Sequence, residues 1–301
     1  MRICVAATPE VAIPTLDFLK ASRYELVTTV TQPDRPAGRG QKPQESAVSI
    51  WSRENQVPCI KPNTTAELIE ALFHIDLLIT IGYGVILPRE VFEKPTHGSI
   101  NLHFSLLPRW RGAAPVQRAI EAGDLVSGVT VFALDEGMDT GPLFVQKHFA
   151  LDGDITSDEL LGELALLGPE AIDESIELIE QGVRPKPQPS QGATRALKIS
   201  KEEVEVDWRL SAELVSQKIR SLTSNPGART HFRQTAVKVF SPSFSEISLS
   251  PGELKVLGND LVVGTGTRAL IIGEVQPAGK AKMASSAWIN GLRLKSGESF
   301  E

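Results

Sequence analysis

The sequence has little cysteine. It contains 2 cysteines in 301 residues, Cys4 and Cys59, and they lie far apart in the chain. A disulfide framework needs several cysteines in a short chain, and a zinc site needs closely spaced ligand pairs. The sequence therefore predicts neither, and it favours a reducing compartment, which we expect to be the cytoplasm.

Long hydrophobic runs are also missing. The chain begins MRICVAATPE, in which the apolar run from Ile3 ends before Thr8 and Pro9. A secretory signal takes about 7–15 consecutive apolar residues, and a membrane-spanning helix takes about 20. We therefore expect no signal peptide and no membrane partner.

The chain has no strong excess of one charge, but its charge is uneven. The net charge is −6; residues 206–301 carry 12 basic and 8 acidic residues, against 19 and 29 in residues 1–205. A basic segment on an acidic protein indicates a polyanion partner. So small an excess also occurs by chance on ordinary solvated surfaces, and charge alone does not decide between the two.

Several catalytic motifs are absent. The sequence has no Walker A and no GxSxG pattern, and the first expected βα turn, AATPEVA, lacks GxGxxG, which argues against a dinucleotide cofactor. Three histidines, His97, His148 and His231, have no companions at metal-ligand spacing. We therefore expect no metal.

The first two-thirds of the chain alternate between short apolar strands and helical segments. The expected strands are residues 2–7, 24–32, 57–60, 76–84, 98–104 and 128–135. The expected helices lie within residues 9–22, 44–56, 64–74, 114–123 and 157–182, the last with a break at Gly168-Pro169. This alternation predicts an α/β fold with a Rossmann-like, doubly wound, mainly parallel sheet.

The pattern changes after residue 182. GVRPKPQPSQGAT (182–194) has three prolines at alternate positions, which predicts a stiff, extended linker, and Ser200 to Glu203 resemble a capping box that starts a short helix. A helix at 212–222, strands at 235–240 and 252–257, and a hairpin at 261–272 follow, and they indicate a small OB-like β-barrel. We expect domains at 1–183 and 206–301, joined by 184–205.

The strand SINLH (99–103) carries unusual polar residues. Asn101 and His103 are two residues apart, so both side chains point to one face of the strand. At the carboxyl end of a parallel strand they would project into the crevice where α/β sheets bind ligands. An amide and an imidazole there suit a carbonyl oxygen that becomes negative during attack, although loop backbone could equally satisfy both.

Two further segments carry charge near expected strand ends. DEGMDTG (135–141) places Asp139 on a glycine-flanked loop, where it could orient His103 or simply form a solvated acidic turn. PDRPAGRGQK (33–42) holds Arg35, Arg39 and Lys42, which suits either a plain surface loop or a contact with a phosphate backbone.

Five segments together resemble a known family. NLHFSLLPRWRGAAPVQ (101–117) and DEGMDTG (135–141) are similar to the signature of enzymes that use 10-formyltetrahydrofolate. TQPDRPAGRGQ (31–41), IGYGVILP (81–88) and KISKEEVEVDW (198–208) narrow the resemblance to the methionyl-tRNA formyltransferases, along essentially the whole chain. The resemblance implies a Rossmann-like formyltransferase domain and an OB-like tRNA-binding domain.

The resemblance also implies roles for particular residues. The catalytic residues of the family match Asn101, His103 and Asp139, and its tRNA-contacting loop matches Arg35, Arg39 and Lys42, with Arg39 expected to enter the acceptor end. The positions expected to bind the folate are Ile81, Gly82, Tyr83, Gly84, Val85, Ile86, Leu87, Pro88, Ser105, Leu106, Leu107 and Pro108.

The implied reaction is formyl transfer from 10-formyltetrahydrofolate to the α-amino group of methionine on initiator methionyl-tRNA, by a monomeric enzyme without a metal. Two alternatives stay open. A formyltransferase acting on a small amine would need neither the basic loop nor the C-terminal barrel. An RNA-binding protein on a decayed scaffold would not need Asn101, His103 and Asp139, which are all present.

Overall fold

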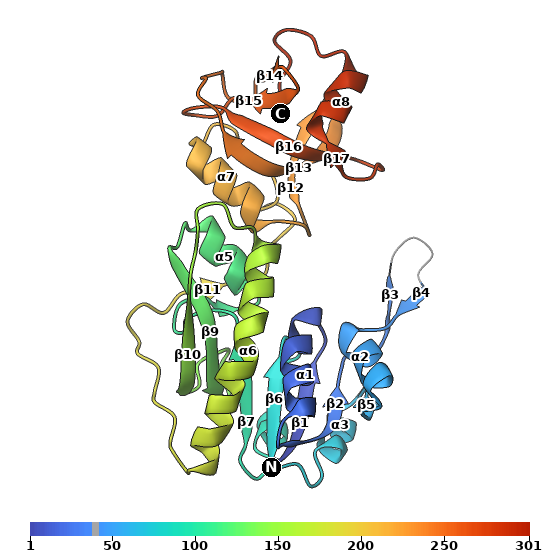
Figure 1. Ribbon diagram of the computed structural model, residues 1–301, viewed down its shortest axis with the longest axis vertical. Coiled ribbons are helices and arrows are strands. Elements are labelled where there is room, and N and C mark those ends of the chain that lie inside the picture. The colour runs from blue at the N-terminus through green and yellow to red at the C-terminus, as the bar shows by residue number, and fades with distance from the viewer. Residues whose placement is uncertain (38–41) are drawn as a thin grey trace. The chain divides into compact units, whose positions relative to one another are not determined.

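The computed structural model describes residues 1–37 and 42–301, and for residues 35–37, 42 and 43 it gives the backbone alone. The described chain divides into two compact units (Figure 1). The first contains Met1–Pro115, Val126–Ala150 and Leu161–Ala196, and the second contains Val116–Leu125, Leu151–Leu160 and Leu197–Glu301. The domain boundaries expected at residues 183 and 205 stay predictions.

The first unit is built on a seven-stranded sheet in the order β10-β9-β7-β6-β1-β2-β5. Five neighbouring strands run parallel, while β9 is antiparallel to β7 and β10 is antiparallel to β9. The strands are β1 (Arg2–Ala7), β2 (Glu25–Val30), β5 (Cys59–Ile60), β6 (Leu77–Ile81), β7 (Ser99–His103), β9 (Val126–Ala133) and β10 (Leu143–Ala150).

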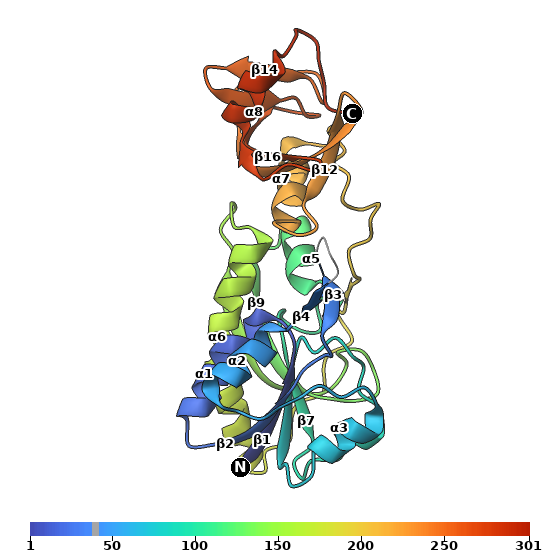
Figure 2. The same ribbon diagram turned by 90° about the vertical axis from the view of Figure 1, so that its right-hand side faces the viewer.

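Helices cover both faces of this sheet, which is why β6 is buried along its whole length. Figure 2 shows α1 (Ile13–Ala21), α2 (Ala47–Asn55) and α6 (Ser157–Glu180) on one side, and α3 (Thr65–Ala71) on the other. Short helix α4 (Arg89–Phe92) packs on α3. The doubly wound, mainly parallel fold predicted from the sequence is confirmed.

Helix α6 corrects one expectation, because it runs unbroken through Pro169. Proline removes one intrahelical hydrogen bond, but Leu164, Ile172 and Ile176 bury one face of the helix completely. Burial of that face outweighs the local break. Gly168 allows the close approach, since a β-carbon there would lie 2.8 Å from both a Leu102 methyl group and the Thr15 hydroxyl.

Two small sheets lie beside the main one in the first unit. β3 (Arg35–Ala37) pairs antiparallel with β4 (Lys42–Gln44), so the described flanks of the expected basic loop are strands. β8 (Arg111–Gly112) pairs parallel with β11 (Arg195–Ala196). The second pair brings the proline-rich segment back to the segment that follows the Asn-His strand.

The second unit contains a separate antiparallel sheet, in the order β12-β13-β16-β15-β14 with β17 on β16. The β15–β16 pair confirms the hairpin expected around Gly264 and Gly266. The helices and strands of the second unit are α5 (Pro115–Glu121), α7 (Ala212–Ser221), β12 (Ala228–Phe232), β13 (Thr235–Phe244), β14 (Leu254–Leu257), β15 (Asp260–Val263), β16 (Leu270–Pro277), β17 (Met283–Ala284) and α8 (Ser285–Leu292).

The capping box expected at Ser200 forms, but the helix does not. The Glu203 carboxylate accepts from the Ser200 N–H at 2.8 Å, and the Glu203 N–H donates to the Ser200 hydroxyl at 3.3 Å. The chain then turns into a bridge with β12, where Arg229 exchanges backbone hydrogen bonds with Val204 and Val206. Both valines are buried, so the core captures the chain before a helix can continue.

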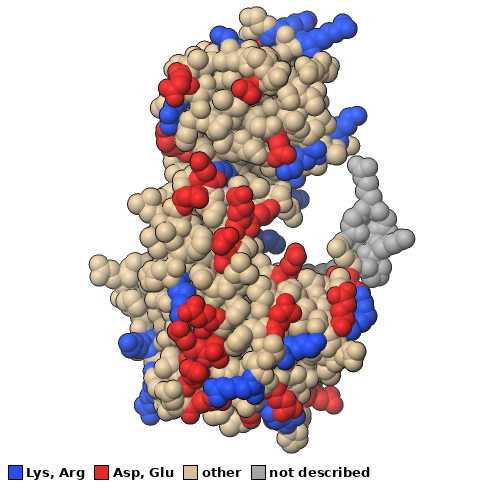
Figure 3. All heavy atoms as spheres, in the orientation of Figure 1, with Lys and Arg blue, Asp and Glu red and all other residues tan. Residues whose placement is uncertain are grey.

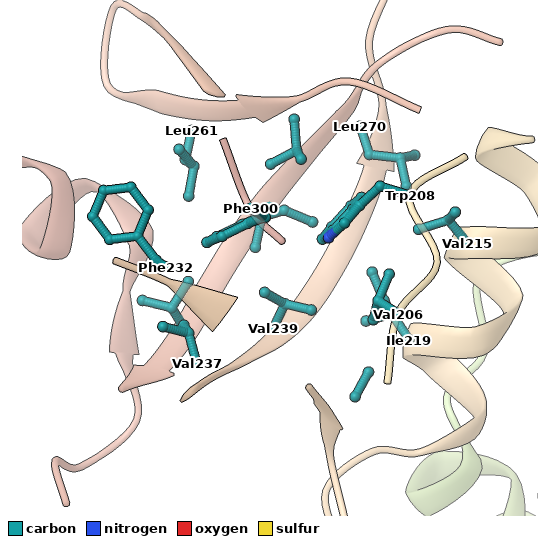
Figure 4. Packing of buried hydrophobic residues seen from close by; sticks show 14 of the residues in the cluster. Val206, Trp208, Val215, Ile219, Phe232, Val237, Val239, Leu261, Leu270 and Phe300 are labelled. Atoms are coloured by element: carbon teal, nitrogen blue, oxygen red, sulfur yellow. The ribbon is translucent and has the colours of Figure 1, made fainter. Parts of the chain in front are cut away.

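An aromatic cluster forms the centre of the second unit (Figure 4). Phe300 stacks on Trp208 with ring centroids 5.5 Å apart, and on Trp288 at 6.0 Å. Phe232 meets the Trp288 ring edge-on at 5.3 Å. Such aromatic pairs add about 0.5–1.5 kcal/mol each beyond their buried area. This cluster joins β12 to the last residues of the chain.

Acidic side chains gather over α6 in Figure 3, and several of them have basic partners. The Lys147 ammonium lies 2.9 Å from the Glu170 carboxylate and 2.5 Å from that of Glu174. The Arg23 guanidinium lies 2.9 Å from Glu180. Exposed pairs of this kind contribute only about 0–1 kcal/mol, so the main effect is an acidic surface, which disfavours a phosphate backbone.

Candidate active site

The candidate active site is a cavity of about 440 Å³ at the carboxyl ends of β6 and β7. All three predicted catalytic residues line it, which agrees with the general position of ligand sites in α/β sheets. The lining residues are Thr80, Gly82, Tyr83, Gly84, Val85, Ile86, Leu87, Phe92, Asn101, Leu102, His103, Phe104, Gly112, Ala113, Pro115, Leu134, Asp135, Gly137, Met138 and Asp139.

The register of two strands fixes the Asn101 side chain. Asn101 on β7 lies opposite Thr80 on β6, and its amide donates to the Thr80 hydroxyl at 2.7 Å. That hydroxyl donates in turn to the Ile100 carbonyl at 3.2 Å. A carboxamide nitrogen carries two hydrogens, so one serves Thr80 and the other can serve an oxygen in the cavity.

His103 is buried, and its ring has two different neighbours. Nε2 lies 2.9 Å from the Trp110 carbonyl oxygen, and Nδ1 lies 3.7 Å from the Asp139 carboxylate. Because a carbonyl oxygen only accepts, Nε2 must carry the hydrogen in this contact. Nδ1 is then the ring nitrogen that faces the Asp139 carboxylate.

Asp139 is held by both its side chain and its backbone. Its carboxylate accepts from the Gly112 N–H at 2.7 Å, and its carbonyl accepts from the Gln188 side chain at 2.9 Å. Its backbone is left-handed, with φ of 55°, a conformation that costs a non-glycine residue roughly 1–3 kcal/mol and persists only where the surroundings hold it. The proximity of Asp139 to His103, which spacing could not establish, is present here.

The predicted folate positions fall into two groups. Gly82, Tyr83, Gly84, Val85, Ile86 and Leu87 line the cavity. Ile81 is completely buried in β6, and Pro88 is the N-cap residue that precedes α4. A tyrosine phenol is neutral near pH 7, and burial raises the pKa of the Tyr83 phenol further.

The turn Ser105–Pro108 does not line the cavity, and buried hydrogen bonds hold it beside the site. The Thr130 hydroxyl donates to the Ser105 carbonyl at 2.6 Å and accepts from the Leu107 N–H at 3.1 Å. The Ser105 hydroxyl donates to the Arg109 carbonyl at 2.7 Å. A folate contact for these residues stays a prediction.

Two of the predicted tRNA-contacting residues, Arg35 and Lys42, lie in β3 and β4. Arg39 lies outside the described residues, and for Arg35 and Lys42 the backbone alone is described. Their tRNA contacts therefore stay predictions.

Sequence reasoning missed several residues of the site. Thr80 was detectable as the polar residue in the apolar run LLITI, one strand away from Asn101. Met138 belongs to the recognised DEGMDTG motif and adds apolar surface to the cavity wall. Gln188 had no signal, because it lies in a segment whose prolines indicate only an extended chain.

Metal-ligand clusters and membrane-spanning helices are both absent from the described residues. No group of three or more His, Cys, Asp or Glu side chains among them could hold a metal ion. No helix in the described part of the chain is both long enough and apolar enough to span a membrane.

Comparison with known proteins gives matches over both units. The family model described as formyl transferase matches residues 1–176, and the model described as formyl transferase, C-terminal domain, matches residues 198–293. A methionyl-tRNA formyltransferase from Acidothermus cellulolyticus is 38% identical over 324 residues, covering 100% of this chain and 100% of that protein.

Two solved structures support the fold. Methionyl-tRNA formyltransferase from Clostridium thermocellum has a TM-score of 0.59 at 20% identity, over 81% of this chain and 94% of that one. HypX from Aquifex aeolicus in complex with tetrahydrofolic acid has a TM-score of 0.69 at 20% identity, over 99% of this chain and 48% of that one. With a family model that covers more than half of the sequence and a relative that matches its full length, the chain belongs to the formyl transferase family.

Proposed function

We propose that the chain transfers the formyl group of 10-formyltetrahydrofolate to the α-amino group of methionine on initiator methionyl-tRNA. The product, N-formylmethionyl-tRNA, serves translation initiation in the cytoplasm. The observation that carries the proposal is the convergence of Asn101, His103 and Asp139 on one cavity, in a chain whose full-length relative is a methionyl-tRNA formyltransferase.

The cavity suits a folate donor. Its volume of about 440 Å³ lies in the range of small-molecule sites. Val85, Ile86 and Met138 contribute exposed apolar side chains to the wall, against which a flat pterin ring can pack. Support also comes from the fold of the neighbour that was solved with tetrahydrofolic acid.

In the proposed reaction the methionyl amine attacks the formyl carbon, and a tetrahedral intermediate with a negative oxygen forms. Asn101 donates its second amide hydrogen to that oxygen, and His103, as the doubly protonated imidazolium, donates from Nδ1. Preorganised donors of this kind each lower a barrier by about 3–4 kcal/mol. Collapse breaks the bond between the formyl carbon and the folate nitrogen.

Asp139 has two roles in this scheme. Its carboxylate lies 3.7 Å from His103 Nδ1, close enough to stabilise a positive charge on the buried imidazole ring. It also assists the movement of the amine proton toward the folate nitrogen that leaves. Formyl is already activated on that nitrogen, so the scheme needs no metal.

The tRNA is proposed to contact Arg35, Arg39 and Lys42, and also the second unit, whose residues 206–301 carry a small basic excess. Such cations neutralise phosphates and make binding depend on salt. Arg39→Ala is expected to reduce formylation of tRNA while folate binding stays unchanged. Loss of folate binding would instead show that this loop shapes the donor site.

One assay separates the proposal from its alternatives. The purified chain is given 10-formyltetrahydrofolate with initiator methionyl-tRNA, glycinamide ribonucleotide or an amino-sugar nucleotide, and formylated products are measured by mass spectrometry. We expect the highest kcat/KM with the tRNA. Preferred transfer to either small amine would overturn the acceptor, and RNA binding without any transfer would indicate an inactive scaffold. Sedimentation tests the expected monomer.

A further inference from the structure

The proline-rich segment does more than connect two parts of the chain. Among the described residues 184–193, only Pro185 and Gln188 are partly buried. Lys186 exchanges two backbone hydrogen bonds with Leu143, of 2.7 and 2.8 Å, at the end of the loop that carries Asp139. The segment is therefore anchored beside the candidate active site at the point where Gln188 turns inward.

The Gln188 carboxamide uses all of its hydrogen-bonding capacity. Its nitrogen donates to the Asp139 carbonyl at 2.9 Å and to the Gly141 carbonyl at 2.7 Å. Its oxygen accepts from Arg111 Nε at 3.1 Å and Nη2 at 2.7 Å. Carbonyls only accept and guanidinium only donates, so the chemistry of the partners fixes the orientation of the amide.

These contacts bear directly on Asp139. Its left-handed backbone is what aims the carboxylate at the Gly112 N–H and at His103. Gln188 holds the carbonyl of Asp139 and the carbonyl two residues later, so it fixes the backbone on the C-terminal side of the carboxylate.

The same segment reaches His103 by a second route. The Thr194 hydroxyl accepts from the Trp110 N–H at 2.9 Å, and the Trp110 carbonyl receives His103 Nε2. Trp110 also has a left-handed backbone, with φ of 65°. Thr194 thus holds Trp110, whose carbonyl sets the ring orientation of His103. Gln188 holds Asp139, which lies opposite the other ring nitrogen, Nδ1.

A short strand pair locks the end of the segment in place. Arg195 and Ala196 form β11 against β8, and the Arg111 N–H donates to the Thr194 carbonyl at 2.9 Å. The approach is so close at Gly112 that a β-carbon there would lie 2.5 Å from the Ala196 carbonyl oxygen. The N–H of that glycine is the one that binds the Asp139 carboxylate.

We propose that residues 186–196 act as a strap that sets the geometry of His103 and Asp139, with Gln188 and Thr194 as its positioning residues. This inference rests on the proposed function, because the effect of the strap on His103 and Asp139 is measured through the rate of formyl transfer. A shift of roughly 1 Å in a catalytic group can cost about 10²-fold in rate.

The test uses two substitutions in the full chain. Gln188→Glu keeps the size and the acceptors for Arg111 but removes both donors, and it turns a carboxylate toward two carbonyl oxygens. Thr194→Val keeps the shape but removes the acceptor for Trp110, while Thr194→Ser restores it. Gln191→Glu, at an exposed position of the same segment, is the matched control for added charge.

We expect Gln188→Glu and Thr194→Val each to lower kcat about 10-fold or more, as a small misplacement of a catalytic group does, with KM for both substrates and the melting temperature near those of the unmodified chain. Thr194→Ser and Gln191→Glu should keep kcat within about twofold of it, since neither breaks the contact. In Gln188→Glu, but not in the other variants, hydrogen exchange should become faster in peptides that cover residues 135–143.

Two results would overturn the strap. One is unchanged kcat in both test variants; the other is loss of kcat only in proportion to lost folded protein, with Thr194→Ser no better than Thr194→Val. An unmodified chain that does not formylate methionyl-tRNA would reject the proposed function instead. Hydrogen exchange of residues 135–143 would still test the strap in that case. Unchanged hydrogen exchange in Gln188→Glu would reject it.

Discussion

The two units use buried polar groups differently. In the first, Thr80, His103 and Thr130 are buried beside the cavity, and each bonds to a residue of the site or to its supporting turn. In the second, stacked aromatic rings fill the core, where the Trp208 indole donates to Thr230 at 2.9 Å. Polar networks fix geometry, whereas apolar packing supplies stability.

This difference predicts where a substitution shows its effect. Changes beside the cavity should alter the rate more than the free energy of unfolding. Changes in the aromatic core should alter the free energy of unfolding more than the chemistry. Five substitutions, in four predictions, test the contrast.

The largest effect is expected from Asp139→Asn, which should lower kcat by ~10²–10⁴. The amide can still accept from the Gly112 N–H, but it can neither stabilise a charged imidazole nor take a proton. Steady-state kinetics and folate titration measure the two properties. Glu136→Gln, at an exposed position of the same loop, is the control and should be active. Lost folate binding in Asp139→Asn would make this residue a ligand contact.

Trp208→Ala should mainly change stability, because this ring lies in the aromatic core of the second unit. Removing a buried ring that stacks on Phe300 at 5.5 Å should lower the free energy of unfolding by about 3–5 kcal/mol. Folate affinity should not change, because the proposed folate site lies in the first unit. Urea unfolding and folate titration check both, with Trp208→Phe as a milder variant. A Trp208→Ala protein of full stability would contradict the aromatic core as the source of stability.

Asn101→Ala and His103→Ala should each lower kcat by ~10²–10³, since each removes one proposed oxyanion donor. Circular dichroism should show that both variants remain folded. Turnover like that of the unmodified chain in either variant would remove that residue from the oxyanion scheme.

Local patterns predicted much of this fold and part of the site. Alternating strands and helices gave the parallel sheet, and a two-residue spacing placed Asn101 and His103 on one face of β7. They did not predict the proximity of Asp139 to His103, because a loop of left-handed backbone held by Gly112 and Gln188 has no periodic signal. The predicted helix break at Pro169 and the predicted helix start at Ser200 were wrong for a related reason. In both places burial of neighbouring residues decided the local structure.

The smallest of the four effects belongs to Thr80, a residue proposed to act only through Asn101. Its hydroxyl accepts from the Asn101 amide at 2.7 Å and is itself tied to the Ile100 carbonyl. Thr80→Val keeps the volume of the side chain but removes that acceptor, so the amide can rotate away from the cavity.

One neutral hydrogen bond is worth about 0.5–1.5 kcal/mol, so kcat should fall roughly tenfold or less. Thr80→Ser retains the hydroxyl and should restore the rate. Because Thr80 is 4% exposed, both variants need a melting curve beside the kinetics. The comparison between the units holds if Thr80→Val loses rate and keeps its melting temperature. A variant that melts earlier with an unchanged kcat would place Thr80 with the packing residues instead, and the polar network would then end at Asn101.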